Sequence, residues 1–208
     1  MFIVFEGIDG AGKTTQIELL ADKLRAAGLD PYITAEPTGM ATGREIRRVL
    51  SGAVPKTPTQ VAAMFVQDRI DHNVDPEQGI ERMLADGRAV ICDRYYYSSL
   101  AYQGSLTDFD WVMACNCDCP EIRRPDLCIF LDLSPEESMK RITRDRDQIE
   151  IYEKAETLTK FRARYMDVFA QLSARGERIE IIDASGSIEQ TADAINKAIA
   201  KHFGIWYK

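Results

Sequence analysis

Glycines, a lysine and a threonine close to the N-terminus could together hold a chain of phosphates. After an apolar run at 2–6 the sequence satisfies the pattern GxxxxGK[ST], reading Gly7-Ile8-Asp9-Gly10-Ala11-Gly12-Lys13-Thr14-Thr15. Glycines let backbone N–H groups turn towards one anion, and a helix that begins here adds its positive N-terminus. We expect positions 7–15 to bind a nucleoside triphosphate. Lys13 would reach the β- and γ-phosphates, and the Thr14 hydroxyl would ligate Mg²⁺.

Asp9 is unusual inside a phosphate-binding loop. A carboxylate beside phosphates is electrostatically costly unless it faces a cation or a hydroxyl. Two interpretations stay open from the residues alone. Asp9 is either a solvated loop residue or a contact to Mg²⁺ and the sugar of an acceptor.

A second polar group, Asp93-Arg94, follows an apolar run at 89–93. Ligands of parallel sheets bind at the carboxyl ends of the strands. Asp93 could therefore lie near Mg²⁺ as an acid of the Walker-B kind, and Arg94 could hold a phosphate through two N–H groups. A structural ion pair at the end of a strand is the alternative.

Strands and helices that could position these residues alternate along the whole chain. Five runs of near-continuous Val, Ile, Leu and Phe are typical of strands buried on both faces of a parallel sheet. They are Phe2–Glu6, Pro31–Glu36, Ala89–Asp93, Leu127–Leu133 and Arg178–Asp183. Helical spacing or start signals mark Lys13–Ala27, Pro58–Ala85, a helix from Ser134, Glu153–Ala174 and Ser187–Phe203. The pattern predicts one α/β domain over residues 1–208, with a doubly wound parallel sheet between helices.

Composition excludes several function classes. The 208 residues carry a net charge of −7, which argues against a nucleic-acid polymer as partner. No run of 18 apolar residues occurs, and the N-terminus lacks the basic segment of a signal peptide, so we expect no membrane span and a cytoplasmic protein. Five cysteines in a chain of this length are expected to be reduced.

The remaining sequence helps to choose among proteins that carry such a loop. A GTPase would need the guanine-reading string Asn-Lys-x-Asp, which does not occur. Motor ATPases are usually larger and oligomeric. A small chain with an arginine-rich late segment fits a nucleotide kinase with a closing lid.

Three motifs together resemble the thymidylate kinase family. The most specific is Asp-Arg-Tyr-x-x-Ser-Ser-x-Ala-Tyr-Gln-Gly at 93–104. The others are the phosphate loop at 5–16, and Glu36-Pro37-Thr38-Gly39 followed by Thr42-Gly43-Arg44-Glu45-Ile46-Arg47. The resemblance runs from Phe2 to about Tyr165. It implies a P-loop NTPase fold with strand order 2-3-1-4-5, transfer of phosphate from ATP to dTMP with Mg²⁺, and a homodimer.

The resemblance also assigns an acceptor pocket. Glu36 and Arg47 would lie over the acceptor, with Arg47 and Arg94 on its phosphate. Phe65 and Arg69, one helical turn apart, would stack on thymine and donate to its O4. Further contacts would come from Ser99 and Gln103 to the base, Tyr102 beneath the sugar, and Asp9 near the 3′-hydroxyl and the metal.

The family has two catalytic layouts, with a basic residue in the phosphate loop or with arginines in the lid. This loop has no arginine, whereas the expected lid at 140–153 begins with Lys140, Arg141, Arg144 and Arg146. We therefore expect the lid type, with the three arginines as candidates to stabilise the γ-phosphate. A solvated, charged helix face is the alternative.

Some features depart from the family pattern. Ala35 and Thr38 replace residues more usual there, and we expect them to affect packing only. Cys115, Cys117 and Cys119 could form a soft-metal or redox site, but they supply only three thiolates, so we interpret them as reduced and non-functional. Two rival functions stay open: another nucleoside monophosphate or deoxynucleoside kinase, and a nucleotide-binding regulator without acceptor chemistry.

Overall fold

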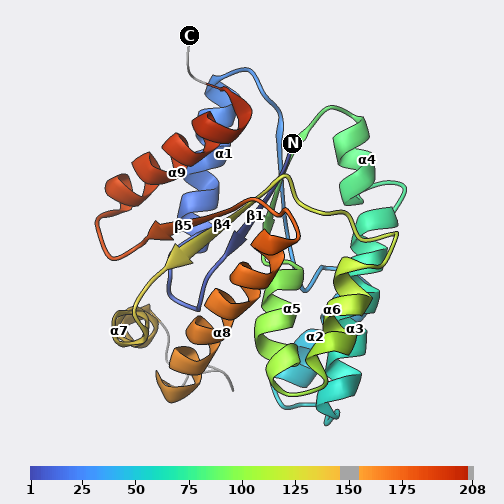
Figure 1. Ribbon diagram of the computed structural model, residues 1–208. Coiled ribbons are helices and arrows are strands. Elements are labelled where there is room, and N and C mark those ends of the chain that lie inside the picture. The colour runs from blue at the N-terminus through green and yellow to red at the C-terminus, as the bar shows by residue number, and fades with distance from the viewer. Residues whose placement is uncertain (146–154, 206–208) are drawn as a thin grey trace.

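Five parallel strands form the centre of the molecule in the order β2-β3-β1-β4-β5, as expected (Figure 1). The computed structural model describes residues 1–145 and 155–205. Each strand is aligned with its neighbours in parallel register, for example Val4 beside both Cys92 and Cys128. The strands are β1 Phe2–Glu6, β2 Pro31–Ala35, β3 Ala89–Asp93, β4 Leu127–Asp132 and β5 Ile179–Asp183.

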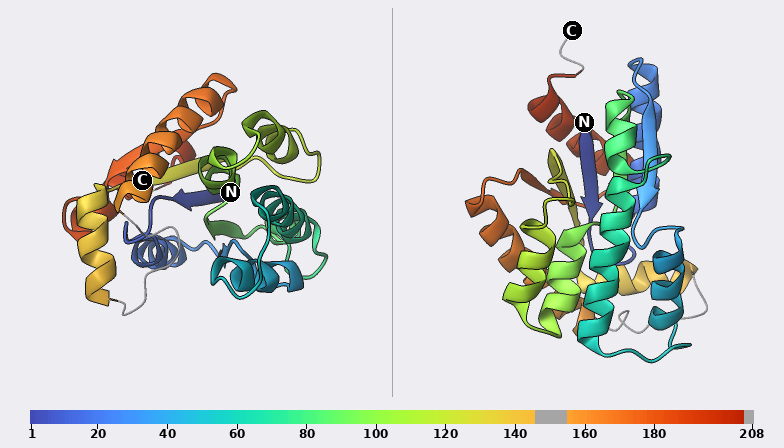
Figure 2. Two further views of the ribbon diagram at one scale, coloured as in Figure 1. Left: turned by 90° about the horizontal axis from the view of Figure 1, so that it is seen from below. Right: turned by 90° about the vertical axis from the view of Figure 1, so that its right-hand side faces the viewer.

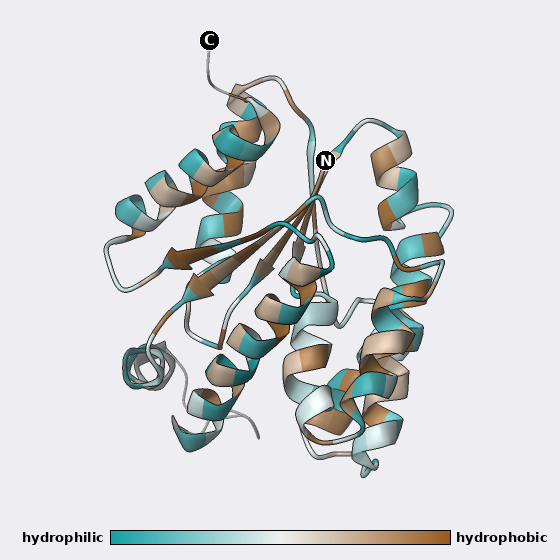
Figure 3. Ribbon diagram, viewed as in Figure 1, coloured by the Kyte–Doolittle hydropathy of each residue, from teal (hydrophilic) through white to brown (hydrophobic). Residues whose placement is uncertain are grey.

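Both faces of the sheet are covered by helices. Alternate residues of β1 point to opposite sides, so that Ile3 and Phe5 belong to one hydrophobic cluster and Phe2 and Val4 to the other. Helices α1 (Lys13–Ala26) and α9 (Ile188–Phe203) cover the first face. The opposite face carries α3 (Pro58–Val74), α5 (Tyr96–Tyr102) and α8 (Ala155–Ala174) (Figure 2). The strands are correspondingly apolar along most of their length (Figure 3).

The segment expected to form one helix, Pro58–Ala85, forms two. Helix α3 begins at a capping box between Thr57 and Gln60 and ends at Val74, and α4 covers Ile80–Ala85. The break follows from Asp75-Pro76. A residue before proline avoids the helical conformation, and the Asp75 carboxylate accepts the backbone N–H groups of Glu77 and Gln78 in a turn.

Several short helices were not expected individually. They are α2 (Ala41–Leu50), α5, the 3₁₀ turn η1 (Gln103–Ser105) and α6 (Phe109–Cys117). The helix expected from Ser134 is α7 (Pro135–Asp145). Helix α5 begins only three residues after β3. As a result, everything in the motif at 93–104 lies at the carboxyl end of the sheet. Across the described ranges, no helix is both long and apolar enough to cross a membrane.

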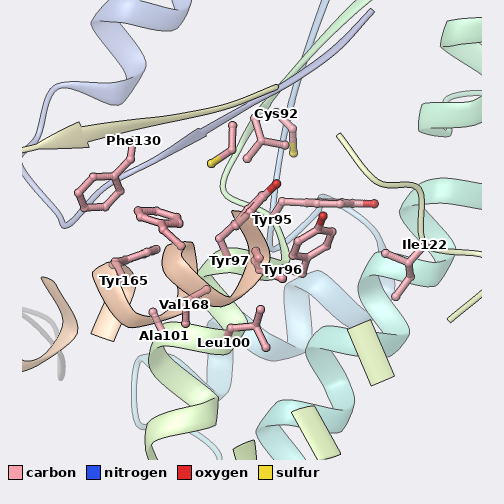
Figure 4. Packing of buried hydrophobic residues seen from close by; sticks show 14 of the residues in the cluster. Cys92, Tyr95, Tyr96, Tyr97, Leu100, Ala101, Ile122, Phe130, Tyr165 and Val168 are labelled. Carbon is pink, nitrogen blue, oxygen red and sulfur yellow. The ribbon is translucent and has the colours of Figure 1, made fainter. Parts of the chain in front are cut away.

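Three consecutive tyrosines connect the motif to the core. Tyr95, Tyr96 and Tyr97 are almost fully buried beneath the sheet (Figure 4). Tyr96 and Tyr97 stack with ring centroids 4.5 Å apart, and Tyr95 meets Phe2 edge-on at 5.2 Å. This aromatic layer fixes the start of α5 against β1.

Candidate active site

The phosphate-binding loop connects β1 to α1 and takes a conformation that its glycines permit. Gly7, Gly10 and Gly12 all have positive φ angles. A Cβ on Gly7 would lie 2.9 Å from the Leu131 carbonyl oxygen, so this position also needs the small residue for close approach to β4. The loop therefore has the shape that was expected for an anion site.

Lys13 lies within the loop that it closes. Its ammonium is 3.3 Å from the Gly7 carbonyl oxygen, and the side chain is buried. Burial lowers the pKa of Lys13 from its ordinary value, and the neighbouring Arg94 lowers it further. An anion placed in the loop would reverse this effect, because it would compensate the desolvated positive charge.

Asp93 and Thr14 line one cavity and are the residues that could hold a magnesium ion. Within the described residues, no group of three His, Cys, Asp or Glu side chains could hold a metal without help. Mg²⁺ usually takes only one or two carboxylates and fills its shell with water and substrate phosphates. Asp93 Oδ1 is buried and makes no hydrogen bond within the described chain, and Thr14 is exposed at the start of α1. These oxygens fit a hard cation bound together with a nucleotide.

Arg94 pairs with Asp9 and not with its neighbour Asp93. Its Nη2 lies 2.5 Å from Asp9 Oδ1, and its guanidinium stands over the Tyr102 ring, 5.6 Å from the centroid. Arg94 has φ 67°, which is unfavourable for a residue with a side chain and typical of strained functional positions. Asp9 is thus a paired side chain, and its cation partner is Arg94.

A cavity of about 170 Å³ opens beside this ion pair. It collects seven of the nine residues expected to contact the acceptor. Those seven are Asp9, Glu36, Phe65, Arg69, Arg94, Tyr102 and Gln103. Pro37, Leu50, Tyr95 and Ser98 complete its lining. Phe65 is half-buried and Arg69 almost fully buried. The two residues are one helical turn apart and both line this cavity, so they lie on the same face of α3.

Ser99 lies behind Arg69 and fixes its orientation. Arg69 Nη2 donates to Ser99 Oγ at 3.2 Å and lies 2.6 Å from Glu36 Oε2, while Nη1 donates to Asn116 Oδ1. Glu36 also accepts from His72 Nδ1 at 3.0 Å. A carboxylate can only accept here, so Nδ1 carries the proton and Nε2 faces the Thr34 hydroxyl. Arg69 is held on three sides by buried polar groups.

Arg47 lines a second, larger cavity and forms hydrogen bonds to the loop that precedes α2. It donates to the carbonyl oxygens of Pro37 and Thr38. The Thr38 hydroxyl and backbone N–H both donate to buried Asp68, at 2.6 and 2.8 Å. Thr38 therefore does more than affect packing. Gly43 permits the close approach, since a Cβ there would lie 2.1 Å from the Thr38 carbonyl oxygen.

The larger cavity, of about 530 Å³, extends from the phosphate loop to the start of α9. Its lining includes Arg141, whose Nη2 donates to the Ala184 carbonyl oxygen at 3.1 Å, and residues that sequence reasoning did not select. Near α9 these residues are Ala184, Gly186, Ile188 and Thr191. The only available signal was the turn after the last strand. Arg146 lies outside the described residues, as does the Arg144 side chain, and Lys140 pairs with Glu137 on the helix surface.

A family model described as "Thymidylate kinase" matches residues 5–195. The chain belongs to the thymidylate kinase family. A "Probable thymidylate kinase" of Thermococcus onnurineus is 39% identical over 212 residues, which cover 97% of this chain and 98% of the relative. Proteins of the same name are 37% identical in Pyrococcus horikoshii (97% and 96% covered) and 44% identical over 168 residues in Methanococcus aeolicus (80% and 78%).

Three polar residues at this thymidylate kinase site were missed by sequence reasoning. Glu6 is buried at the end of β1. His72 donates a hydrogen bond to Glu36, and Asn116 accepts one from Arg69. Each acts through a partner 36 or more residues away in sequence. Asn116 lies between Cys115 and Cys117, which had been considered only for their thiols. All five cysteines are free.

Proposed function

We propose that the chain transfers the γ-phosphoryl group of ATP to dTMP, giving ADP and dTDP, at the junction of the two cavities. Membership of the thymidylate kinase family supports the reaction and ATP as phosphate donor. The observation that carries the site is that Asp9, Glu36, Pro37 and Arg94 line both cavities. A donor in the larger cavity and an acceptor in the smaller one would therefore meet at Arg94.

On the donor side, the loop Gly7–Thr15 would bind the phosphates of ATP, and Lys13 would neutralise charge on the transferring group. Thr14 and Asp93, with Asp9 nearby, would hold Mg²⁺, which when bound neutralises charge on the β- and γ-phosphates. The buried, unpaired Oδ1 of Asp93 supports this assignment. Catalysis of this kind needs positioning and fixed charge more than a strong base.

On the acceptor side, Arg94 and Arg47 would offset the repulsion between two approaching phosphate groups. Phe65 would stack on the base, and Arg69 would donate to the thymine O4. We assign a further base contact to Gln103, with Tyr102 beneath the sugar. Ser99, expected to contact the base, and Glu36 would act on the base by holding Arg69 in place. The shared cavity lining and the fixed orientation of Arg69 support these roles.

The lid arginines Arg141, Arg144 and Arg146 are proposed to stabilise charge that develops on the γ-phosphate. Arg141 lines the donor cavity, which supports its candidacy. We also propose a homodimer, as the family resemblance implies, and a cytoplasmic location where thiols stay reduced. Sedimentation velocity would separate a dimer from a monomer.

Transfer of label from γ-labelled ATP tests the function. The protein is incubated with Mg²⁺ and with dTMP, dUMP, dCMP, dGMP, AMP or thymidine in turn. The proposal expects label in dTDP, with ADP released in equal amount and only when acceptor is present. Label transferred only to another acceptor would identify a different nucleotide kinase, and ATP binding without any transfer would identify a regulator.

A further inference from the structure

Glu6 is a buried carboxylate at the end of β1, immediately before the phosphate loop. Its Oε1 accepts the backbone N–H groups of Tyr95 at 2.9 Å and Ser98 at 3.1 Å. Its Oε2 accepts the Ser98 hydroxyl at 2.7 Å and the Tyr165 hydroxyl at 2.9 Å. One carboxylate thus joins β1, the start of α5 and the middle of α8.

Burial of this carboxylate has an energetic cost. Burial raises the pKa of Glu6 above its ordinary value, although the charge of Arg94 and the hydrogen bonds from Ser98, Tyr95 and Tyr165 oppose the shift. An apolar side chain of similar volume would avoid that cost, but it would leave the Tyr95 and Ser98 backbone N–H groups and the Ser98 and Tyr165 hydroxyls without this acceptor. Glu6 therefore needs an explanation other than packing.

The Ser98 and Tyr165 hydroxyls, which donate to Glu6, also accept hydrogen bonds from Arg94. Arg94 Nη1 lies 3.1 Å from Ser98 Oγ and 3.4 Å from the Tyr165 oxygen. The two hydroxyl oxygens also lie 2.8 Å from each other. A hydroxyl that gives its proton to Glu6 keeps its lone pairs for accepting, and both oxygens lie within reach of the Arg94 guanidinium. Through Ser98 and Tyr165, Glu6 determines where one end of the Arg94 side chain can bind.

Glu6 also holds the Arg94 backbone. The Arg94 N–H donates to the Phe5 carbonyl oxygen at 2.9 Å, and the next N–H, of Tyr95, donates to Glu6. Two successive residues of β1, Phe5 and Glu6, thereby accept the N–H groups on either side of the Arg94 Cα, where φ is unfavourable. Such a conformation persists only where surrounding contacts enforce it.

We propose that Glu6 is the positioning residue that sets the Arg94 guanidinium between the donor and acceptor phosphates. It does so by fixing the Arg94 backbone and by orienting the Ser98 and Tyr165 hydroxyls towards Nη1. This inference rests on the role proposed for Arg94. Glu6 does not touch substrate. Its effect on the reaction passes entirely through Arg94.

The test compares Tyr165→Phe with Tyr97→Phe. Each substitution removes a buried phenol hydroxyl that donates to a buried carboxylate, Glu6 in one case and Glu177, at 2.5 Å, in the other. Misplacing a reacting group by about 1 Å can cost ~10² in rate. We expect Tyr165→Phe to lower kcat/KM for dTMP by about 10-fold or more while KM for ATP stays within about 2-fold, and Tyr97→Phe to leave both near wild type.

A double-mutant cycle separates action through Arg94 from general loosening. In an Arg94→Lys background, Tyr165→Phe should add little further loss, because the group it positions is already changed. Glu6→Gln, whose single carbonyl oxygen cannot accept both from the two backbone N–H groups and from the two hydroxyls, should show a larger version of the same pattern, with thermal melts as the check on folding. Additive losses, or equal losses in Tyr97→Phe, would overturn the inference. A wild-type protein inactive on dTMP would instead contradict the proposed function.

Discussion

Arg69 and Glu36 form a buried ion pair in the lining of the smaller cavity, with Arg69 Nη2 2.6 Å from Glu36 Oε2 and both side chains almost inaccessible to solvent. The pair is held in place by Ser99 and Asn116 on the arginine and by His72 on the carboxylate. A guanidinium fixed this firmly presents donors in one direction only. That rigidity is what a site needs in order to discriminate between bases.

A substitution at Arg69 should alter the preference for one base over another more than it alters the affinity for nucleotides in general. Arg69→Lys keeps a cation beside Glu36 but loses the planar fork that reaches Ser99 and Asn116. We expect kcat/KM for dTMP to fall by about 10-fold or more, and the ratio of dTMP to dCMP to narrow. The lysine is preferred to alanine because removing a partner from a buried pair costs about 3–5 kcal/mol of stability.

Phe65→Ala is the matched comparison on the same face of α3. Stacking contributes roughly 1–3 kcal/mol for any base, so its loss should weaken dTMP and dCMP alike and leave their ratio unchanged. An unchanged ratio in Arg69→Lys, or a changed one only in Phe65→Ala, would place base discrimination elsewhere.

Lys13→Ala should remove most of the rate while the protein stays folded. Loss of one electrostatic donor to a developing charge typically costs on the order of 10²–10³ in kcat. Lys160→Ala, on the exposed side of α8, serves as the control for loss of a positive charge. Steady-state kinetics with a thermal melt decides, and a kcat within a few-fold of wild type would remove the phosphate-loop assignment.

Much of the fold and part of the site could be predicted because the relevant signals are local. The glycines at 7, 10 and 12 determine the shape of the phosphate loop directly, and Thr57 with Pro58 marks the start of α3. Strand order and acceptor residues came from the family resemblance, and the cavity lining brings most of those residues together.

The missed residues depend on contacts between distant parts of the chain. Glu6 bonds to Tyr165 over 159 positions, and Asn116 to Arg69 over 47. No periodicity or turn signal marks such pairs. The break in the helix after Val74 is different, since the Asp75-Pro76 dipeptide was a readable signal that the long apolar pattern obscured.

Thr38→Val should destabilise the protein and weaken acceptor binding together. It removes the hydroxyl that donates to Asp68, and a hydrogen bond to a charged group contributes about 1.5–3 kcal/mol. Chemical denaturation should show a loss in that range, with a higher KM for dTMP because Arg47 binds the same loop. Thr107→Val, which loses only a bond to a neutral carbonyl, should cost less than about 1.5 kcal/mol and leave KM unchanged.

The cysteines should differ sharply in reactivity. Burial raises the pKa of Cys117 to about 12 and those of Cys92 and Cys128 well above their ordinary value. A raised pKa leaves less thiolate at pH 8, so these three thiols should resist labelling in the folded protein, and the half-buried Cys115 and Cys119 should be labelled before them. Labelling followed by peptide mass mapping checks the order. Early modification of Cys92 or Cys128 in the folded protein would contradict it.

The most direct test of the account is the wild-type ratio of kcat/KM for dTMP to that for dCMP. Thymine presents the acceptor O4 where cytosine presents an amino donor, and Arg69 can only donate. A site built on such pairing can reject the wrong partner by up to ~10⁴. We predict that kcat/KM is higher for dTMP than for dCMP by at least about 10². Equal values, or a preference for dCMP, would contradict it.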